Sequence, residues 1–243
     1  MHIVKPNSFD FNKKFQFDFS GGDLSSDGGL LLIRDFLDSI GFDRVIRNHF
    51  YTNDSALFRI HSDQDNLMQR IFQIVGSYFN DNDADELKTD PVYCAVLDKE
   101  SLASQPTMSR FFNRLDDSTL SQMEAIHRTL RKIIYRIRKP EHVLFDLDST
   151  LLNTYGNQEG EGFNYHYQAH GYHPLLCYDG LTGDLLKAEL RERAEYCSKD
   201  ADEFLRPLME EFLNDYPDIP VFLRGDSGFA SPEIYSLAET HGS

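Results

Sequence analysis

The sequence lacks the features that mark membrane, secreted and zinc-containing proteins. No apolar run among its 243 residues approaches the roughly 20 residues that a membrane-spanning helix needs. The first residues also lack the apolar core of a secretion signal. Its three cysteines, Cys94, Cys177 and Cys197, never form a C-x-x-C pair, which argues against a disulfide framework and a structural zinc site. We therefore expect a cytoplasmic protein with no membrane partner.

Basic side chains are scarce, with 24 Lys and Arg against 40 Asp and Glu, for a formal net charge of −16. The surplus of acid is concentrated in the C-terminal part. Residues 1–140 hold 18 basic and 20 acidic side chains, whereas residues 141–243 hold 6 and 20. With 40% hydrophobic and 13% aromatic residues, the composition excludes a disordered acidic tail. A nucleic-acid partner would require the basic residues to gather locally.

One such gathering lies between residues 127 and 140, where no carboxylate follows Glu124. Its cations are Arg128, Arg131, Lys132, Arg136, Arg138 and Lys139. Two interpretations stay open. The segment is either a solvated helix face or a helix that contacts DNA phosphates, for which local charge matters more than the total.

Residues 1–140 predict a mainly helical region that ends at Pro140. Serine and threonine residues that precede runs with a 3.6-residue apolar period indicate where its helices begin. The predicted helices are one capped by Ser26 and ended by Gly41, one capped by Ser62, a short one from Thr107 through Phe112, and a long basic one from Ser118 to about Arg138.

In residues 141–243 the apolar pattern changes from the helical period to one typical of strands. The run HVLFDLDST predicts a buried strand that ends in two acids, and a hairpin is predicted at Asp179–Gly183. An acidic helix with Phe204 and Phe212 on its inner face follows. The run IPVFLRGDSGF then predicts a second strand with an aspartate at its end, before a final helix capped by Ser231.

The aspartates at these strand ends are candidate metal ligands. In an extended strand Asp146 and Asp148 point to the same face, with Cα atoms roughly 7 Å apart. Hard ions such as Mg²⁺ prefer oxygen ligands, and paired ions about 4 Å apart cleave phosphodiesters in many enzymes. Asp148 and Asp226 are the candidate pair, although aspartates at strand ends also act as helix caps and turn formers. Arg191 and Arg224 are candidates to offset this acid or to contact phosphate.

Several segments together resemble the group 1 DDE transposases of bacterial insertion sequences. They occur in the same order over nearly the whole chain: YFNDNDADELKTDP, LASQPTMSRFFNRL, FDLDST, NQEGEGFNYHY, HPLLCYDGLTGDLL and FLRGDSGF. The resemblance implies an α/β protein with a helical DNA-end-binding region, residues 1–140, followed by the first part of an RNase H-like mixed sheet, residues 141–243. It further implies transposition activity, Mg²⁺ or Mn²⁺ as two bound ions, double-stranded element ends and target DNA as partners, and self-association.

The same resemblance assigns roles to the acids. Asp148 would be the first catalytic acid and Asp226 the second, and Asp146 would assist in holding the metal. The family's third acid is a glutamate on a helix beyond a further strand, and no residue here fills that role. Glu233 and Glu239 lie on the helix directly after the second aspartate, which is the wrong element. We therefore expect a C-terminally truncated transposase that is inactive, or nearly so, on its own.

Two alternatives remain at this point. VLFDLDSTL also fits the hhhDxDxT pattern of haloacid dehalogenase-like phosphatases, in which Asp146 would be the nucleophile, Asp148 the acid/base and Asp226 a Mg²⁺ ligand. Such a fold requires parallel strands joined by crossover helices, whereas a tight antiparallel pair is predicted here. The other alternative is a non-catalytic DNA-binding regulator of transposition, which needs only the basic helix.

Overall fold

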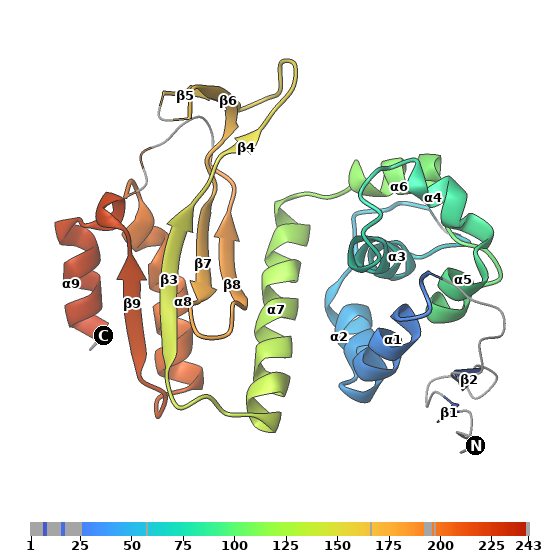
Figure 1. Ribbon diagram of the computed structural model, residues 1–243, viewed down its shortest axis with the longest axis horizontal. Helices are drawn as coiled ribbons and strands as arrows, with labels where there is room; N and C mark the ends of the chain where they lie inside the picture. Colours follow the sequence, from blue (N-terminus) through green and yellow to red (C-terminus); the bar gives the residue numbers. More distant parts are fainter. Residues whose placement is uncertain are drawn as a thin grey trace, which may run out of the picture. The chain divides into compact units, whose positions relative to one another are not determined.

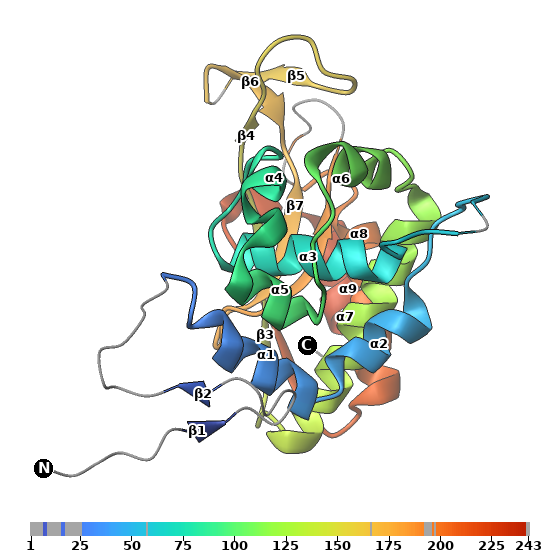
Figure 2. The ribbon, with the colours of Figure 1, turned by 90° about the vertical axis from the view of Figure 1, so that its right-hand side faces the viewer.

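The computed structural model describes residues 7–8, 16–17, 26–56, 58–165, 167–191, 196 and 198–241. The chain divides into two compact units, an N-terminal unit of residues Met1–Ile134 and a C-terminal unit of residues Tyr135–Ser243, drawn from two directions in Figures 1 and 2. Within the described ranges, no helix combines the length and the apolar character needed to cross a bilayer.

The N-terminal unit is mainly helical, as predicted. Its two short strands, β1 (Asn7–Ser8) and β2 (Gln16–Phe17), pair antiparallel. Its helices are α1 (Leu30–Ser39), α2 (Phe42–His49), α3 (Asp63–Val75), α4 (Asp83–Glu86), the 3₁₀ helix η1 (Leu87–Thr89), α5 (Pro91–Leu97), α6 (Gln105–Phe112) and most of α7 (Asp117–Ile137).

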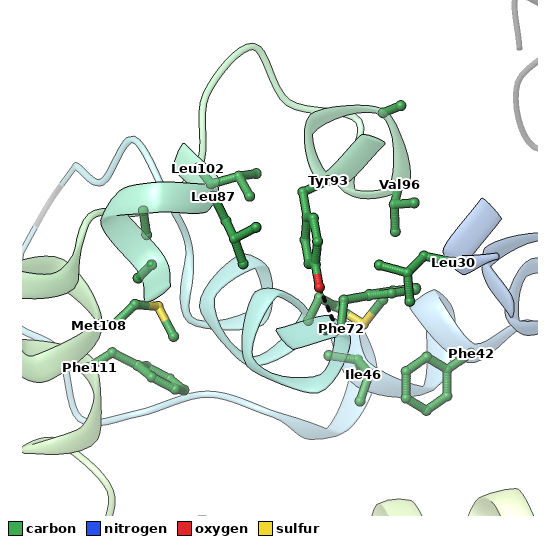
Figure 3. Packing of buried hydrophobic residues seen from close by; sticks show 14 of the residues in the cluster. Leu30, Phe42, Ile46, Phe72, Leu87, Tyr93, Val96, Leu102, Met108 and Phe111 are labelled. Atoms are coloured by element: carbon green, nitrogen blue, oxygen red, sulfur yellow. Dashed lines mark hydrogen bonds between the residues drawn. The ribbon is translucent and has the colours of Figure 1, made fainter. Parts of the chain in front are cut away.

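The core of this unit packs around α3, as Figure 3 shows. Phe72 on α3 and Tyr93 on α5 are fully buried, and the Tyr93 hydroxyl donates to the Phe72 carbonyl oxygen at 3.3 Å. Burial raises the pKa of Tyr93. A Cβ atom at Gly76 would collide with the Tyr93 hydroxyl oxygen, so this position requires glycine. The buried Tyr93 hydroxyl is thus satisfied by the backbone of α3.

Two of the predicted helix signals are confirmed in detail. Ser62 caps α3 in a capping box, in which its Oγ accepts from the Asp65 amide at 3.1 Å and its own amide donates to Asp65 Oδ2 at 2.9 Å. Gly41 follows the end of α1 and has a positive φ of 73°, a conformation that glycine adopts without strain.

Other predicted helix starts were wrong. Ser26 donates to Asp27 instead of capping a helix, and α1 begins later, at Leu30. The long helix α7 begins at Asp117, because Asp116 rather than Ser118 accepts from the Thr119 amide, at 3.0 Å. Helix α6 starts at Gln105, two residues before Thr107. Helices α2, α4 and α5 and the 3₁₀ helix η1 were not predicted.

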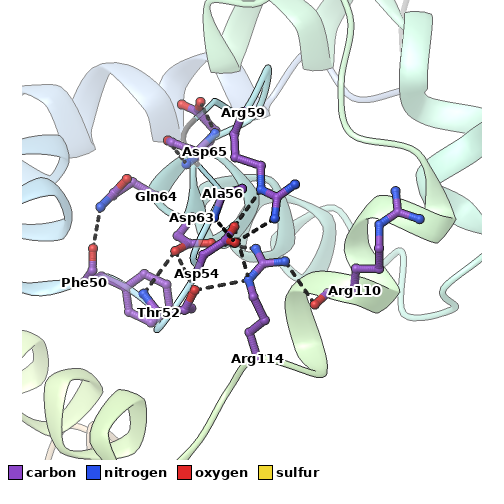
Figure 4. A network of polar contacts seen from close by, with 11 residues as sticks. Phe50, Thr52, Asp54, Ala56, Arg59, Asp63, Gln64, Asp65, Arg110 and Arg114 are labelled. Atoms are coloured by element: carbon purple, nitrogen blue, oxygen red, sulfur yellow. Dashed lines mark hydrogen bonds and ion pairs between the residues drawn. The ribbon is translucent and has the colours of Figure 1, made fainter.

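A polar network joins the segment between α2 and α3 to the chain after α6 (Figure 4). Arg114 donates to Asp63 Oδ1 at 2.7 Å and to Thr52 Oγ1 at 3.1 Å. Although burial alone would raise the pKa of Asp63, the hydrogen bonds from Thr52 and Arg114 hold it below its usual value. Asp54 accepts two hydrogen bonds from Arg59, at 2.6 and 2.7 Å, which lower the pKa of Asp54 to about 2.

Replacement of Arg114 by methionine should destabilise the N-terminal unit by about 1–3 kcal/mol, because it leaves the Asp63 carboxylate without its cation. Urea unfolding at neutral pH, followed by circular dichroism, measures this destabilisation. The effect should shrink as the pH falls through the lowered pKa of Asp63, since a protonated Asp63 gains nothing from the cation. The control is Arg110→Met, since Arg110 is exposed and its guanidinium contacts Thr107 Oγ1 at 3.2 Å. Equal destabilisation in both variants would contradict a role for the network.

In the described part of the C-terminal unit, the strands form two sheets, which are accompanied by two α-helices and a short 3₁₀ helix. The four-stranded sheet has the order β8-β7-β3-β9, and the three-stranded sheet has the order β4-β6-β5. The elements are β3 (Val143–Ser149), β4 (Leu152–Asn153), β5 (Gly162–Asn164), β6 (Ala169–Tyr172), β7 (Leu175–Asp179), β8 (Leu185–Glu189), α8 (Ala201–Asp215), β9 (Val221–Gly225), the 3₁₀ helix η2 (Ser227–Phe229) and α9 (Pro232–His241).

The larger sheet is mixed and is buried on one face. Strand β3 pairs antiparallel with β7 and parallel with β9. Alternate residues Val143, Phe145 and Leu147 are buried in a core shared with α8, where the Phe145 and Phe212 rings meet edge to face with centroids 4.9 Å apart. The predicted α/β class, both strands, the hairpin, the acidic helix and the last helix with its Ser231 cap are therefore confirmed.

The smaller sheet was not predicted. We call residues 150–174, which contain β4, β5 and β6, the arm. Its strands are two to four residues long and rich in glycine and asparagine, so the sequence showed only a turn-rich connection between β3 and β7. In both views the arm extends beyond the end of the larger sheet (Figures 1 and 2).

Candidate active site

The candidate acids lie at one end of the larger sheet. In the parallel register of β3 with β9, Asp146 is opposite Arg224 and Leu147 is opposite Gly225. Asp148 and Asp226 each follow by one residue, and the Asp226 backbone is still extended, with φ −72° and ψ 179°. Neighbouring strands are roughly 4.8 Å apart, and matched residues point to the same face. The register therefore gives the two residues matching positions one residue beyond the paired strands, on the face opposite the buried one.

Each of the two acids also has a local role. Asp148 Oδ1 accepts from the Ser149 amide at 2.7 Å, and Asp226 Oδ1 accepts from the Gly228 amide at 2.7 Å and thereby caps η2. Both residues are exposed. The predicted alternative, that such aspartates act as caps, thus holds for Asp226. It does not compete with metal binding, since a carboxylate has about four acceptor positions over its two oxygens.

Asp146 lies two residues before Asp148 on β3 and is bound by Arg224. We call the end of the sheet that carries Asp148 and Asp226 the tip. The Arg224 Nε donates to Asp146 Oδ1 at 2.9 Å, and its Nη2 donates to Oδ2 at 2.5 Å. These hydrogen bonds lower the pKa of Asp146. The hairpin residue Gly180 borders the pair, because a Cβ atom there would lie 2.8 Å from Arg224 Nη2. The prediction that Arg224 offsets the acid is therefore confirmed for Asp146.

Arg191 has a different position. It is buried, and its guanidinium donates to the carbonyl oxygens of His173, Tyr196 and Lys199 at 3.1–3.2 Å. These bonds tie the start of β7 to the segments that follow β8. Its position is therefore that of a structural residue rather than of a residue that contacts phosphate.

No third carboxylate joins the pair within the described ranges. There, no group of three or more His, Cys, Asp or Glu side chains is placed to hold a metal ion. Glu233 and Glu239 are exposed residues of α9. The described tip thus supplies carboxylate oxygens suited to a hard divalent ion, but from two aspartates rather than three acids.

The predicted DNA-contacting cations lie on α7 and just after it. At 100° per residue, Arg128, Lys132 and Arg136 follow one face of the helix, beside the apolar face that carries Ile126 and Ile133. Arg128, Arg136, Arg138 and Lys139 are exposed, Lys132 is half-buried and Arg131 is buried. Lys139 lies 3.7 Å from Asp218, and Arg128, Arg131 and Lys132 also have partners within the chain. Arg136 and Arg138 are therefore the exposed cations of this set for which the described residues provide no partner.

Two features of this region were not found from the sequence. The contact of Gly180 with the Arg224–Asp146 pair depends on the hairpin's place over β3, which no local pattern reveals. The aromatic residues of the arm can be read from the sequence, but their common face cannot. That face depends on the pairing of β5 with β6, and these strands are too short to be predicted from a residue pattern.

Comparison with known proteins supports the resemblance seen in the sequence. The family described as Transposase DDE domain group 1 matches residues 7–243. No curated protein matches the chain in sequence. Two solved structures are similar. For "Mos1 transposase paired-end complex with left transposon end" the identity is 12% and the TM-score 0.29, with 85% of this chain and 65% of that chain covered. For "Crystal structure of a pre-cleavage Mos1 transpososome" the identity is 12% and the TM-score 0.27, with 90% and 77% covered.

This chain thus spans 65% of the length of the first of these structures. The family match, in contrast, extends over nearly all of this chain, and it includes both strands that carry the candidate acids. The chain therefore belongs to the group 1 family of DDE transposase domains.

Proposed function

We propose that the chain acts in DNA-mediated transposition, and that Asp148 and Asp226 hold the divalent ions required for DNA strand cleavage and transfer. The observation that carries this proposal is the parallel register of β3 and β9, which gives the two aspartates matching positions on neighbouring strands. The proposal also rests on the family to which the chain belongs.

The residues at the tip fit Mg²⁺ or Mn²⁺. Their carboxylate oxygens are hard donors, and both side chains are exposed at the edge of the sheet, where a phosphodiester has access. Divalent ions bound there would activate a water or hydroxyl nucleophile and stabilise the leaving oxygen. Asp146, which was predicted to assist in holding the metal, has both carboxylate oxygens bound by Arg224, and the pair keeps a positive charge beside Asp148 and Asp226.

Two aspartates alone give a weak and incomplete site. Mg²⁺ requires near-ideal octahedral geometry, and misplacement of a nucleophile by about 1 Å costs on the order of a hundredfold in rate. Because the described residues add no third acid, we expect the 243-residue polypeptide to be inactive, or nearly so, in strand cleavage.

We further propose that double-stranded DNA, from element ends and target, binds along the cations of α7 and of the residues just after it. We call these residues the basic stripe: Arg128, Arg131, Lys132, Arg136, Arg138 and Lys139. We also propose that the protein self-associates and acts in the cytoplasm. Residues 1–140 are nearly neutral, whereas residues 141–243 carry 20 acidic and 6 basic side chains. DNA phosphates are therefore attracted to the stripe, and the metal ions offset the repulsion at the acidic tip.

A non-catalytic regulator of transposition is the second candidate, and the lack of a third acid among the described residues favours it. Such a protein needs only the basic stripe. The phosphatase alternative is disfavoured, because Arg224 binds both carboxylate oxygens of Asp146, the residue that would be the nucleophile, and because β3 lies beside the antiparallel strand β7.

Binding of Mn²⁺, followed by electron paramagnetic resonance, tests the site independently of catalysis. Asp148→Asn and Asp226→Asn should each weaken binding on the order of tenfold or more, since each removes a ligand. Asp218→Asn is the matched control, because Asp218 is an exposed aspartate before the opposite end of β9. Binding that is equally strong in all three variants would refute the assignment.

Replacement of Arg136 and Arg138 by glutamine should weaken binding to duplex DNA. The slope of log affinity against log salt should fall by about 1 for each DNA phosphate that the variant no longer neutralises. Fluorescence anisotropy over a range of salt concentrations measures both quantities. Arg206→Gln on α8 controls for charge alone, since Arg206 pairs with Asp202 one turn away at 3.4 Å. An unchanged salt slope in the α7 variant would show that DNA binds elsewhere.

A further inference from the structure

The arm presents a group of aromatic rings on one surface. The Phe163 ring lies edge to face with the Tyr165 ring, with centroids 5.1 Å apart, and with the His170 ring, with centroids 5.2 Å apart. The pairing of β5 with β6 places Phe163 opposite His170, and Tyr165 lies two residues further along. We call these three residues the aromatic face. Tyr165 is 81% exposed and Phe163 36%, so the rings are open to a ligand.

The chemistry of the arm favours bases over phosphates. Residues 150–174 contain no lysine or arginine, while Glu159 and Glu161 add negative charge. A surface that recruits the DNA backbone needs cations, which this one does not offer. Exposed rings, in contrast, stack on the faces of unpaired bases, and every base has such a face.

The arm is attached next to the candidate acids. Its two ends continue from Ser149 and Leu175, which pair with each other at the end of β3 and β7. Asp148 is the neighbour of Ser149 and pairs with Leu176. As Figure 1 shows, β4, β5 and β6 lie beyond this end of the larger sheet. A DNA strand cut at the acidic tip is therefore close to the arm.

The arm is held by its own polar contacts. Thr154 Oγ1 donates to Glu161 Oε2 at 2.6 Å, and the Tyr172 hydroxyl donates to the Glu159 carbonyl oxygen at 2.5 Å. At Gly171, a Cβ atom would collide with the Leu152 carbonyl oxygen, so β4 and β6 approach closely. Because these contacts order the arm before a ligand arrives, binding requires little further ordering.

We propose that the aromatic face binds unpaired bases of the DNA end beside the scissile phosphodiester. This inference rests on the proposed function and deepens it, because the acids would act on the phosphate while the arm holds the bases that leave the stack. Opening a duplex costs energy that stacking on protein rings repays in part. A blunt duplex should therefore bind less tightly than one that already has unpaired bases.

The test compares the affinity of the full chain for a blunt duplex and for the same duplex with a short single-stranded overhang that contains 2-aminopurine. The unaltered protein should prefer the overhang roughly 5- to 30-fold and quench its fluorescence. Tyr165→Leu and Phe163→Leu should remove most of this preference, and Tyr165→Phe should keep it. Tyr235→Leu, at an exposed tyrosine of α9, is the control and should leave it unchanged.

The outcomes separate this inference from the proposed function. No preference in the unaltered protein, or a preference that survives the leucine substitutions, overturns the role of the aromatic face while Mn²⁺ binding at Asp148 and Asp226 still reports the metal site. A leucine variant that binds the blunt duplex less tightly, but keeps the same ratio of overhang affinity to blunt-duplex affinity, also overturns it. A change of oligomeric mass in Tyr165→Leu, without a change in DNA preference, assigns the aromatic face to a second copy of the chain and overturns the base-binding role.

Discussion

The parallel pairing of β3 with β9 fixes the relation between residues that are far apart in the sequence. It places Arg224 opposite Asp146, where the two side chains form a bidentate ion pair. One residue beyond the last paired positions of each strand, it gives Asp148 and Asp226 matching places at the tip. A shift of one residue in this register would send one aspartate to the opposite face of the sheet. The proposed metal site, the proposed place of the scissile phosphate and the proposed role of the arm all depend on this pairing.

The buried face of the sheet is strong enough to hold two like charges together. Two carboxylates about 5 Å apart repel by about 1 kcal/mol in bulk water and by about 3 kcal/mol at the effective dielectric of a protein surface. Burial of each large apolar side chain contributes about 1.5–3 kcal/mol, and Phe145, Leu147 and Phe229 are all buried close to this end of β3 and β9. The core therefore outweighs the repulsion, and the Arg224–Asp146 pair adds a cation beside it. A divalent ion bound by both aspartates would remove the remaining cost.

The sequence predicted those parts of the fold in which one residue pattern repeats. The strand period of residues 143–149 and the turn at Asp179–Gly183 gave β3 and the hairpin, and Ser62 gave the start of α3. It failed where several polar residues compete as caps, as at Asp116 and Ser118, and where strands are too short to show a period, as in the arm. Of the site, the two aspartates were predicted from their strand ends. The bidentate form of the Arg224 contact and its packing against Gly180 depend on sheet register, which is a property of the assembled fold.

The proximity of Asp148 and Asp226 is the claim that most needs measurement, and a pair of cysteines measures it directly. Matched positions on neighbouring strands lie within the Cα separation of about 4.4–6.8 Å that a disulfide requires. The double variant Asp148→Cys/Asp226→Cys should therefore form an intramolecular disulfide under mild oxidation, detected by mass spectrometry of its peptides. The offset pair Asp148→Cys/Arg224→Cys should form it less readily. Free thiols at 148 and 226 under conditions that oxidise the offset pair would contradict the register and the metal site built on it.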